Sequence, residues 1–177
     1  SALTTRHSAL FSDRLNHASL IDAAKLSDAK HQRYQHRDHL GLGRLLQKSE
    51  ATNKIILSDG VFSMEGSIAP LAELVALKKE HQALLLIDDA HALGVLGKNG
   101  KGCAEQLQID PEDIDLLIGT FGKAFGSSGA FVAGKHDLLE YVMQKARSLI
   151  YTTAAPAVLI AACATSLAII QNEPARR

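Results

Sequence analysis

Residues 71–89, LAELVALKKEHQALLLIDD, decide the fold of this chain. The first part, Leu71–His81, has apolar residues at helical spacing, and Ala83–Ile87 is a continuous apolar run that ends in two aspartates. Another apolar segment, Lys54–Ser58, precedes the helix across a loop that contains glycine. A strand, a helix and an all-apolar strand in this order are typical of a βαβ unit in a parallel sheet that is covered on both faces.

The same alternation continues on both sides of this unit. Further strands are predicted at Ala9–Ser12, Ile114–Thr120 and Ala130–Ala133, with an edge strand inside the polar stretch Lys30–Asp38. Further helices are predicted at Ala18–Leu26, Leu40–Glu50, His136–Ser148 and Pro156–Gln171. Since the sequence has no internal repeat, we expect one α/β domain with a mostly parallel sheet covered by helices.

The composition argues against several classes of protein. Lys plus Arg and Asp plus Glu are 19 each and tryptophan is absent, which disfavours a nucleic-acid partner or an anionic membrane. There is no apolar run of about 18 residues, so no membrane span is expected. Cys103 and Cys163 have neither CxxC nor metal-site spacing, which favours reduced thiols in a cytoplasmic protein. The start of the chain lacks both Met and the apolar core of a signal peptide, as expected for a processed or trimmed chain.

Lys123 is the most unusual of the reactive side chains. Because the carboxyl ends of parallel strands meet at one edge of a sheet, the segments 58–63, 88–91 and 120–123 are expected to lie together. Lys123 stands in GTFGKAFG, residues 119–126, without an acidic neighbour. Such a setting can lower the pKa of a lysine and suit it to Schiff-base formation. The alternative is a lysine that simply reaches solvent from a strand end.

Asp88-Asp89-Ala90-His91 is the second signal. A carboxylate directly after a buried strand is costly unless it is paired, and it could pair with the nitrogen of a cationic heterocycle. His91 could then reach a neighbouring substituent of that ring. A helix-capping Asp and a structural His are the alternative, and an Asp-x-x-His metal pair lacks a third ligand, so no metal site is expected.

Other histidines are less informative. His17 lies just before a predicted helix, where a structural role is more common. His31, His36 and His39 are surrounded by Arg and Lys, and we interpret them as a solvated face rather than a metal site.

Seven segments in order resemble the α-oxoamine synthases, fold-type I pyridoxal-phosphate enzymes that join an amino acid to an acyl thioester and release carbon dioxide. The likeness extends over essentially the whole chain. The segments are Asp13–Ser19, Asp59–Gly66, Ala69–Leu71, Asp88–His91, Gly97–Gly102, Thr120–Gly126 and Arg147–Thr153.

The resemblance implies a role for each matching residue. Lys123 would carry pyridoxal phosphate as a Schiff base and remove the α-proton of the substrate. Asp88 would pair with the pyridine nitrogen, and His91 and Ser63 would donate to the phenolic oxygen of the ring. His17 would stack on the ring and help to orient the substrate carboxylate.

Three threonines complete the implied site. Thr120 would contact the cofactor phosphate. Thr152 and Thr153 would reach the phosphate in the other subunit, which implies a homodimer with shared active sites.

Within the family, three segments are most similar to members that condense L-alanine with a pimeloyl thioester in biotin biosynthesis. They are Phe62–Gly66, Ala69–Leu71 and Ile150–Ala154. The acyl carrier could be coenzyme A or a carrier protein, and members that use glycine and acetyl-CoA are the alternative. Ala92-Leu93 and Ser67 depart from the family pattern, which puts the substrate pocket in doubt.

Family members are considerably longer than 177 residues. Before the position of His17 they have a glycine-containing loop for the cofactor phosphate, and after the large domain they have a small domain with an arginine for the substrate. The resemblance therefore implies that residues 1–177 are the central part of the large domain, without those two regions, and need not be active alone.

Two other hypotheses compete with this one. A non-catalytic subunit of the same fold would not need Lys123, Asp88 and His91 together. A nicotinamide-dependent oxidoreductase would need a GxGxxG segment after its first strand, which the sequence lacks.

Overall fold

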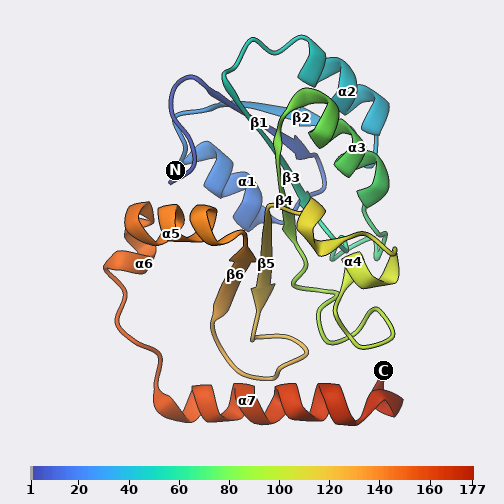
Figure 1. Ribbon diagram of the computed structural model, residues 1–177, viewed down its shortest axis with the longest axis vertical. Coiled ribbons are helices and arrows are strands. Elements are labelled where there is room, and N and C mark those ends of the chain that lie inside the picture. The colour runs from blue at the N-terminus through green and yellow to red at the C-terminus, as the bar shows by residue number, and fades with distance from the viewer. Residues whose placement is uncertain (1) are drawn as a thin grey trace.

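The computed structural model describes residues 2–177, which form a single six-stranded sheet with the order β2-β1-β3-β4-β5-β6 (Figure 1). Neighbouring strands are parallel from β2 to β5, and only β6 is antiparallel to its neighbour. The strands are β1 Ser8–Asp13, β2 Lys30–Tyr34, β3 Asn53–Asp59, β4 Leu84–Asp88, β5 Leu116–Thr120 and β6 Ala130–Gly134. The predicted mostly parallel α/β sheet is confirmed, including the edge position of the polar strand β2.

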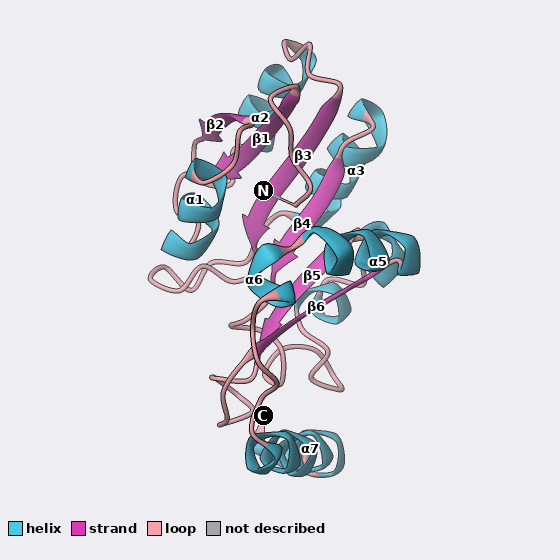
Figure 2. Cartoon of the chain, turned by 90° about the vertical axis from the view of Figure 1, so that its left-hand side faces the viewer, coloured by secondary structure: helices cyan, strands magenta, loops and turns pink. Residues whose placement is uncertain are grey.

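Helices lie on both faces of this sheet, as Figures 1 and 2 show. On one face lie α2 (His39–Gln47) and α3 (Leu71–His81), and on the other lie α1 (Ala18–Lys25) and α5 (His136–Lys145). The remaining helices are α4 (Cys103–Gln106), α6 (Arg147–Ile150) and α7 (Ala157–Asn172), with short 3-10 turns at Pro111–Asp113 and Pro174–Arg176. None of the helices within residues 2–177 combines the length and the apolar character that crossing a membrane would require.

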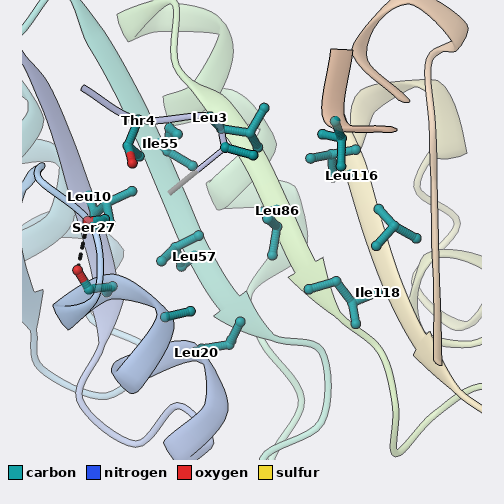
Figure 3. A pocket seen from close by; sticks show the side chains of 15 residues that line it. Leu3, Thr4, Leu10, Leu20, Ser27, Ile55, Leu57, Leu86, Leu116 and Ile118 are labelled. Atoms are coloured by element: carbon teal, nitrogen blue, oxygen red, sulfur yellow. Dashed lines mark hydrogen bonds between the residues drawn. The ribbon is translucent and has the colours of Figure 1, made fainter. Parts of the chain in front are cut away.

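The two faces are covered unequally. Between the sheet and α2/α3 lies the main core, whose largest members are fully buried: Phe11, Ile56, Leu85 and Ile87 from the strands, and Leu42, Leu46, Leu71 and Leu74 from the helices. On the other face α1 covers β1 and β3 while α5 reaches the β5 side, so an apolar groove remains between them (Figure 3). Leu57, Leu86 and Ile118 line this groove.

Three local predictions also need correction. The helix predicted for His136–Ser148 is interrupted at Ala146, whose extended backbone (φ −76°, ψ 97°) separates α5 from α6. The strand predicted from Ile114 begins two residues later, because a 3-10 turn ends there. The four-residue helix α4 was not predicted, since it is too short to show apolar periodicity.

Helix α7 lies beyond the edge of the sheet where β5 ends, and none of its residues is buried (Figure 1). It contacts the loops of that edge. The Ser166 hydroxyl donates to the Phe125 carbonyl at 2.7 Å, and Arg177, just after the helix, donates to the Lys98 carbonyl at 2.9 Å.

Candidate active site

The candidate site lies at the carboxyl ends of β3, β4 and β5. Asp59 pairs in register with Asp88, and Asp88 with Ile118, two residues before Thr120. Because side chains alternate along a strand, the side chains of Asp59, Asp88 and Thr120 all lie on the α1 face, next to the end of the apolar groove. The prediction that residues after these strands share one edge is therefore confirmed.

His17 is brought to this edge by helix α1, for which it is the N-cap. Its Nδ1 accepts from the Ser19 backbone N–H at 3.3 Å and lies 2.9 Å from the Ser19 hydroxyl. With Nδ1 as the acceptor, the proton of the neutral ring belongs on Nε2, the nitrogen that faces away from the helix. His17 is thus both a structural cap and an exposed imidazole at the site.

Asp59 ties His17 to the sheet. Its Oδ2 accepts the His17 backbone N–H at 2.7 Å. The side chain of Asn16 fixes the same junction, since it accepts from the Asp59 N–H at 3.1 Å and donates to the Leu57 carbonyl at 2.9 Å. Burial raises the pKa of Asp59 to about 6; the charge of Asp88 raises it as well, while the His17 N–H and Lys123 act in the opposite direction.

Asp88 and Asp89 have different surroundings. Asp89 is fully buried, and its Oδ2 accepts the N–H of Cys103, the first residue of α4, at 2.9 Å, so Asp89 is the aspartate that binds the start of a helix. No N–H or O–H donor within residues 2–177 reaches its Oδ1, which lies beside Gly60 and the Cys103 thiol. Burial raises the pKa values of both the Asp89 carboxyl and the Cys103 thiol. Asp88 is only half-buried and faces the site.

Lys123 lies in the β5–β6 turn, and its side chain is exposed. Thr120 holds the turn in place, because its hydroxyl accepts from the Gly122 N–H and donates to the Gly129 carbonyl, both at 3.1 Å. This self-contained hydrogen bonding gives Thr120 a structural role in addition to the predicted phosphate contact.

His91 is the fifth member of the group. Its pKa is lowered, first by burial and then by the positive charge of Lys123, while Asp88 acts in the opposite direction. The charges of Lys123, Asp88 and His17 therefore all act on His91. The structure brings together these four residues with Asp59 at one edge of the sheet.

The remaining predicted residues are all exposed. Ser63 lies in the loop that follows β3. Thr152 and Thr153 are exposed in the segment that joins α6 to α7, on the opposite side of the β5–β6 hairpin in Figure 1 from the loops that follow β4.

The interpretation of the histidine cluster as a solvated face is wrong, because all three rings are partly buried. His36 Nδ1 lies 3.1 Å from Asp13 Oδ1, and its Nε2 lies 2.9 Å from the Ser67 hydroxyl. Asp13 is buried and also accepts the Arg37 N–H at 2.7 Å. His31 contacts the Ser12 hydroxyl at 2.7 Å.

Sequence reasoning assigned no role to Asp59 or Asn16. The signal for Asp59 was its place directly after a predicted strand, the same signal that singled out Asp88. Asn16 carried no such signal, since its partners come from a strand 41 to 43 residues away.

The groups at this edge fit pyridoxal phosphate in kind. A lysine amine suits its aldehyde, a half-buried carboxylate suits its ring nitrogen, and two imidazoles and a threonine hydroxyl can approach its oxygens.

Known proteins support the same interpretation. The family Aminotransferase class I and II matches residues 1–177. An 8-amino-7-oxononanoate synthase from Methylococcus capsulatus is 46% identical over 177 residues, which are 100% of this chain and 46% of that protein. The chain therefore spans less than half the length of this relative.

Solved structures give the same fold. A serine palmitoyltransferase from S. paucimobilis with bound PLP–myriocin aldimine has a TM-score of 0.91 and 33% identity, over 97% of this chain and 45% of that one. An 8-amino-7-oxononanoate synthase from Francisella tularensis has a TM-score of 0.82 and 37% identity, over 98% of this chain and 50% of that one.

Proposed function

Because this chain belongs to the aminotransferase class I and II family, we propose that it is part of a pyridoxal-phosphate-dependent acyltransferase. The reaction is the condensation of L-alanine with a pimeloyl thioester to 8-amino-7-oxononanoate, with release of carbon dioxide, a step of biotin biosynthesis. The observation that carries the proposal is that four side chains lie together at one edge of the sheet: Lys123, Asp88, His91 and His17. The chain that holds them is 46% identical to an 8-amino-7-oxononanoate synthase.

The roles of the residues follow from their chemistry. When bound, pyridoxal phosphate withdraws electrons from the α-carbon of an amino acid. The Lys123 amine would hold its aldehyde and, once released, would take the α-proton of the amino acid. Asp88 keeps the ring nitrogen protonated by offering it a negative partner.

The remaining groups orient the cofactor and the substrate. His91 and Ser63 would donate to the phenolic oxygen of the cofactor, Thr120 would contact its phosphate, and His17 would stack on its ring and help to orient the substrate carboxylate. The location of His17 at the start of α1 supports this role, since α1 lies on the face onto which Asp88 opens.

The assembly belongs to the same proposal. Residues 1–177 are the central part of a large domain, and further chain supplies a phosphate-binding loop and a small domain. Two copies share their sites through Thr152 and Thr153. The exposure of these threonines and of Tyr151 beside them, with 72% of Tyr151 accessible, supports a contact there. Two free cysteines fit the cytoplasm.

An assay of free thiol tests the function. The protein that carries these residues is incubated with pimeloyl-CoA, pyridoxal phosphate and L-alanine, and the coenzyme A that it releases is measured. Release that needs L-alanine and is lost in Lys123→Ala supports the proposal. Faster release from acetyl-CoA with glycine would replace it with the glycine-specific activity of the family.

A further inference from the structure

We propose that Asp59 is a positioning residue, which holds His17 at the edge of the site through the main-chain N–H of that histidine. This inference deepens the proposed function, and rests on it for the statement that His17 faces the cofactor. Asp59 itself would not touch the reacting atoms.

The hydrogen bond from His17 to Asp59 is the link between α1 and the carboxyl end of β3. The distance from the His17 nitrogen to Asp59 Oδ2 is 2.7 Å, typical of a bond to an ionised acceptor. Asp59 is 4% exposed, so water does not readily replace the carboxylate as acceptor. The link therefore fixes the N-cap of the helix against the sheet.

The His17 side chain provides no second anchor to the sheet. Its Nδ1 is engaged with Ser19, two residues further along the same helix. Within the described chain, the position of the imidazole at the site thus depends on the backbone at His17. Asp59 holds this backbone directly, and the two hydrogen bonds of the Asn16 side chain to β3 hold the residue before it.

The location of Asp59 is costly, which argues that it serves the site. It stands in register beside a second carboxylate, Asp88, in a buried position where two negative charges oppose each other. Structural positions usually avoid such pairs, while functional sites retain them. Lys123 is the cation whose charge opposes that of Asp88 at Asp59.

The direct test is the exchange of the His17 amide proton in the chain without cofactor, followed by two-dimensional NMR. In Asp59→Ala the amide loses its acceptor and should exchange about tenfold faster or more. In Asp59→Asn an amide oxygen remains in the same place, and the protection should stay within about threefold of the parent chain. Unchanged exchange in Asp59→Ala, or equal loss in both variants, would overturn the proposal.

A matched control separates local positioning from general loss of stability. Asp115 is also buried and accepts a main-chain N–H, that of Leu85 at 2.8 Å, but it stands just before β5, at the end of the sheet away from the site. Asp115→Ala should leave His17 exchange unchanged. If it accelerates His17 exchange as much as Asp59→Ala does, the effect is global and the proposal fails.

Titration with pyridoxal phosphate extends the test to the cofactor. Asp59→Ala should weaken binding about tenfold and alter the circular dichroism of the bound ring, and Asp59→Asn should restore both. If the protein that carries these residues together with the phosphate-binding loop binds no pyridoxal phosphate, the proposed function is contradicted, while the amide exchange still decides the role of Asp59.

Discussion

Asp88 and Asp89 are adjacent and chemically identical, yet one faces the site and the other closes a helix. The sequence predicted both roles, the cofactor partner and the helix cap, but as alternatives for one aspartate. The alternation of side chains along β4 separates them, because Asp88 shares a face with Leu84 and Leu86 while Asp89 turns inward beyond the end of the strand. The apolar pattern of β4 was enough to locate the two aspartates at its end. The role of Asp89 depends on α4, which is too short to show a periodic pattern.

Asp59→Asn should change how stability depends on pH. The pKa of Asp59 is about 6 in the folded chain against an ordinary 3.8, so the folded state binds the proton more tightly. The free energy of unfolding should therefore fall as the pH rises from about 4 to 6 through this group. At pH 7, Asp59→Asn should be more stable than the parent by about 1 to 3 kcal/mol. Near pH 4 the difference should vanish. Urea unfolding at both pH values measures it, and an equal difference at both would contradict the assigned burial.

Asp13 should matter more than Ser67 in the network around His36. Asp13 accepts the N–H groups of Leu15 and Arg37 as well as His36, so Asp13→Ala removes the acceptor of three partly buried hydrogen bonds and should cost about 2 to 3 kcal/mol. Ser67→Ala removes a single hydroxyl from a half-buried position and should cost about 1 kcal/mol or less. Denaturant unfolding of both variants compares them, and equal costs would be inconsistent with this network.

At the scale of elements, long periodic segments were predictable and their junctions were not. The helix Leu71–His81 was predicted with the bounds it has in the structure, because its apolar spacing extends over its whole length. The break at Ala146 left no mark in the periodicity of the segment. The exposed groove beside α1 was also unpredictable, since an all-apolar strand such as β4 has the same sequence pattern whether helices cover one face of the sheet or both.

Helix α4 is placed by glycines that allow the Asp89 carboxylate to approach. A Cβ on Gly102 would lie 1.9 Å from Asp89 Oδ2, and the residue has a positive φ of 87°. Gly102→Ala should cost about 3 kcal/mol or more, from the left-handed backbone and the steric clash together. Gly66→Ala is the matched control, since its φ is 65° but its Cβ would meet no atom within 4 Å, and it should cost about 1 kcal/mol. Thermal unfolding ranks the two, and an equal loss would show that the contact with Asp89 is unimportant.

At the scale of the whole molecule, α7 presents apolar side chains to solvent. Val158 and Ile160 are 73% and 57% exposed. If two copies share their sites, these side chains are expected to become buried between them. Replacing both with Ser should then weaken dimerisation by about tenfold or more, from the loss of buried apolar area. Leu26→Ser, at a residue 82% exposed after α1, is the control and should leave association unchanged. Sedimentation equilibrium measures this, and a parent protein that stays monomeric would contradict the shared site.

The central claim is that this strand edge holds pyridoxal phosphate on Lys123, and one labelling experiment tests it most directly. The chain is incubated with pyridoxal phosphate, reduced with borohydride and mapped by peptide mass. The account predicts a pyridoxyl group on Lys123 that is absent in Lys123→Arg, because the charge of that lysine acts on both Asp59 and His91 at this edge. Label spread evenly over other exposed lysines such as Lys101 and Lys135, or no label at all, would contradict it.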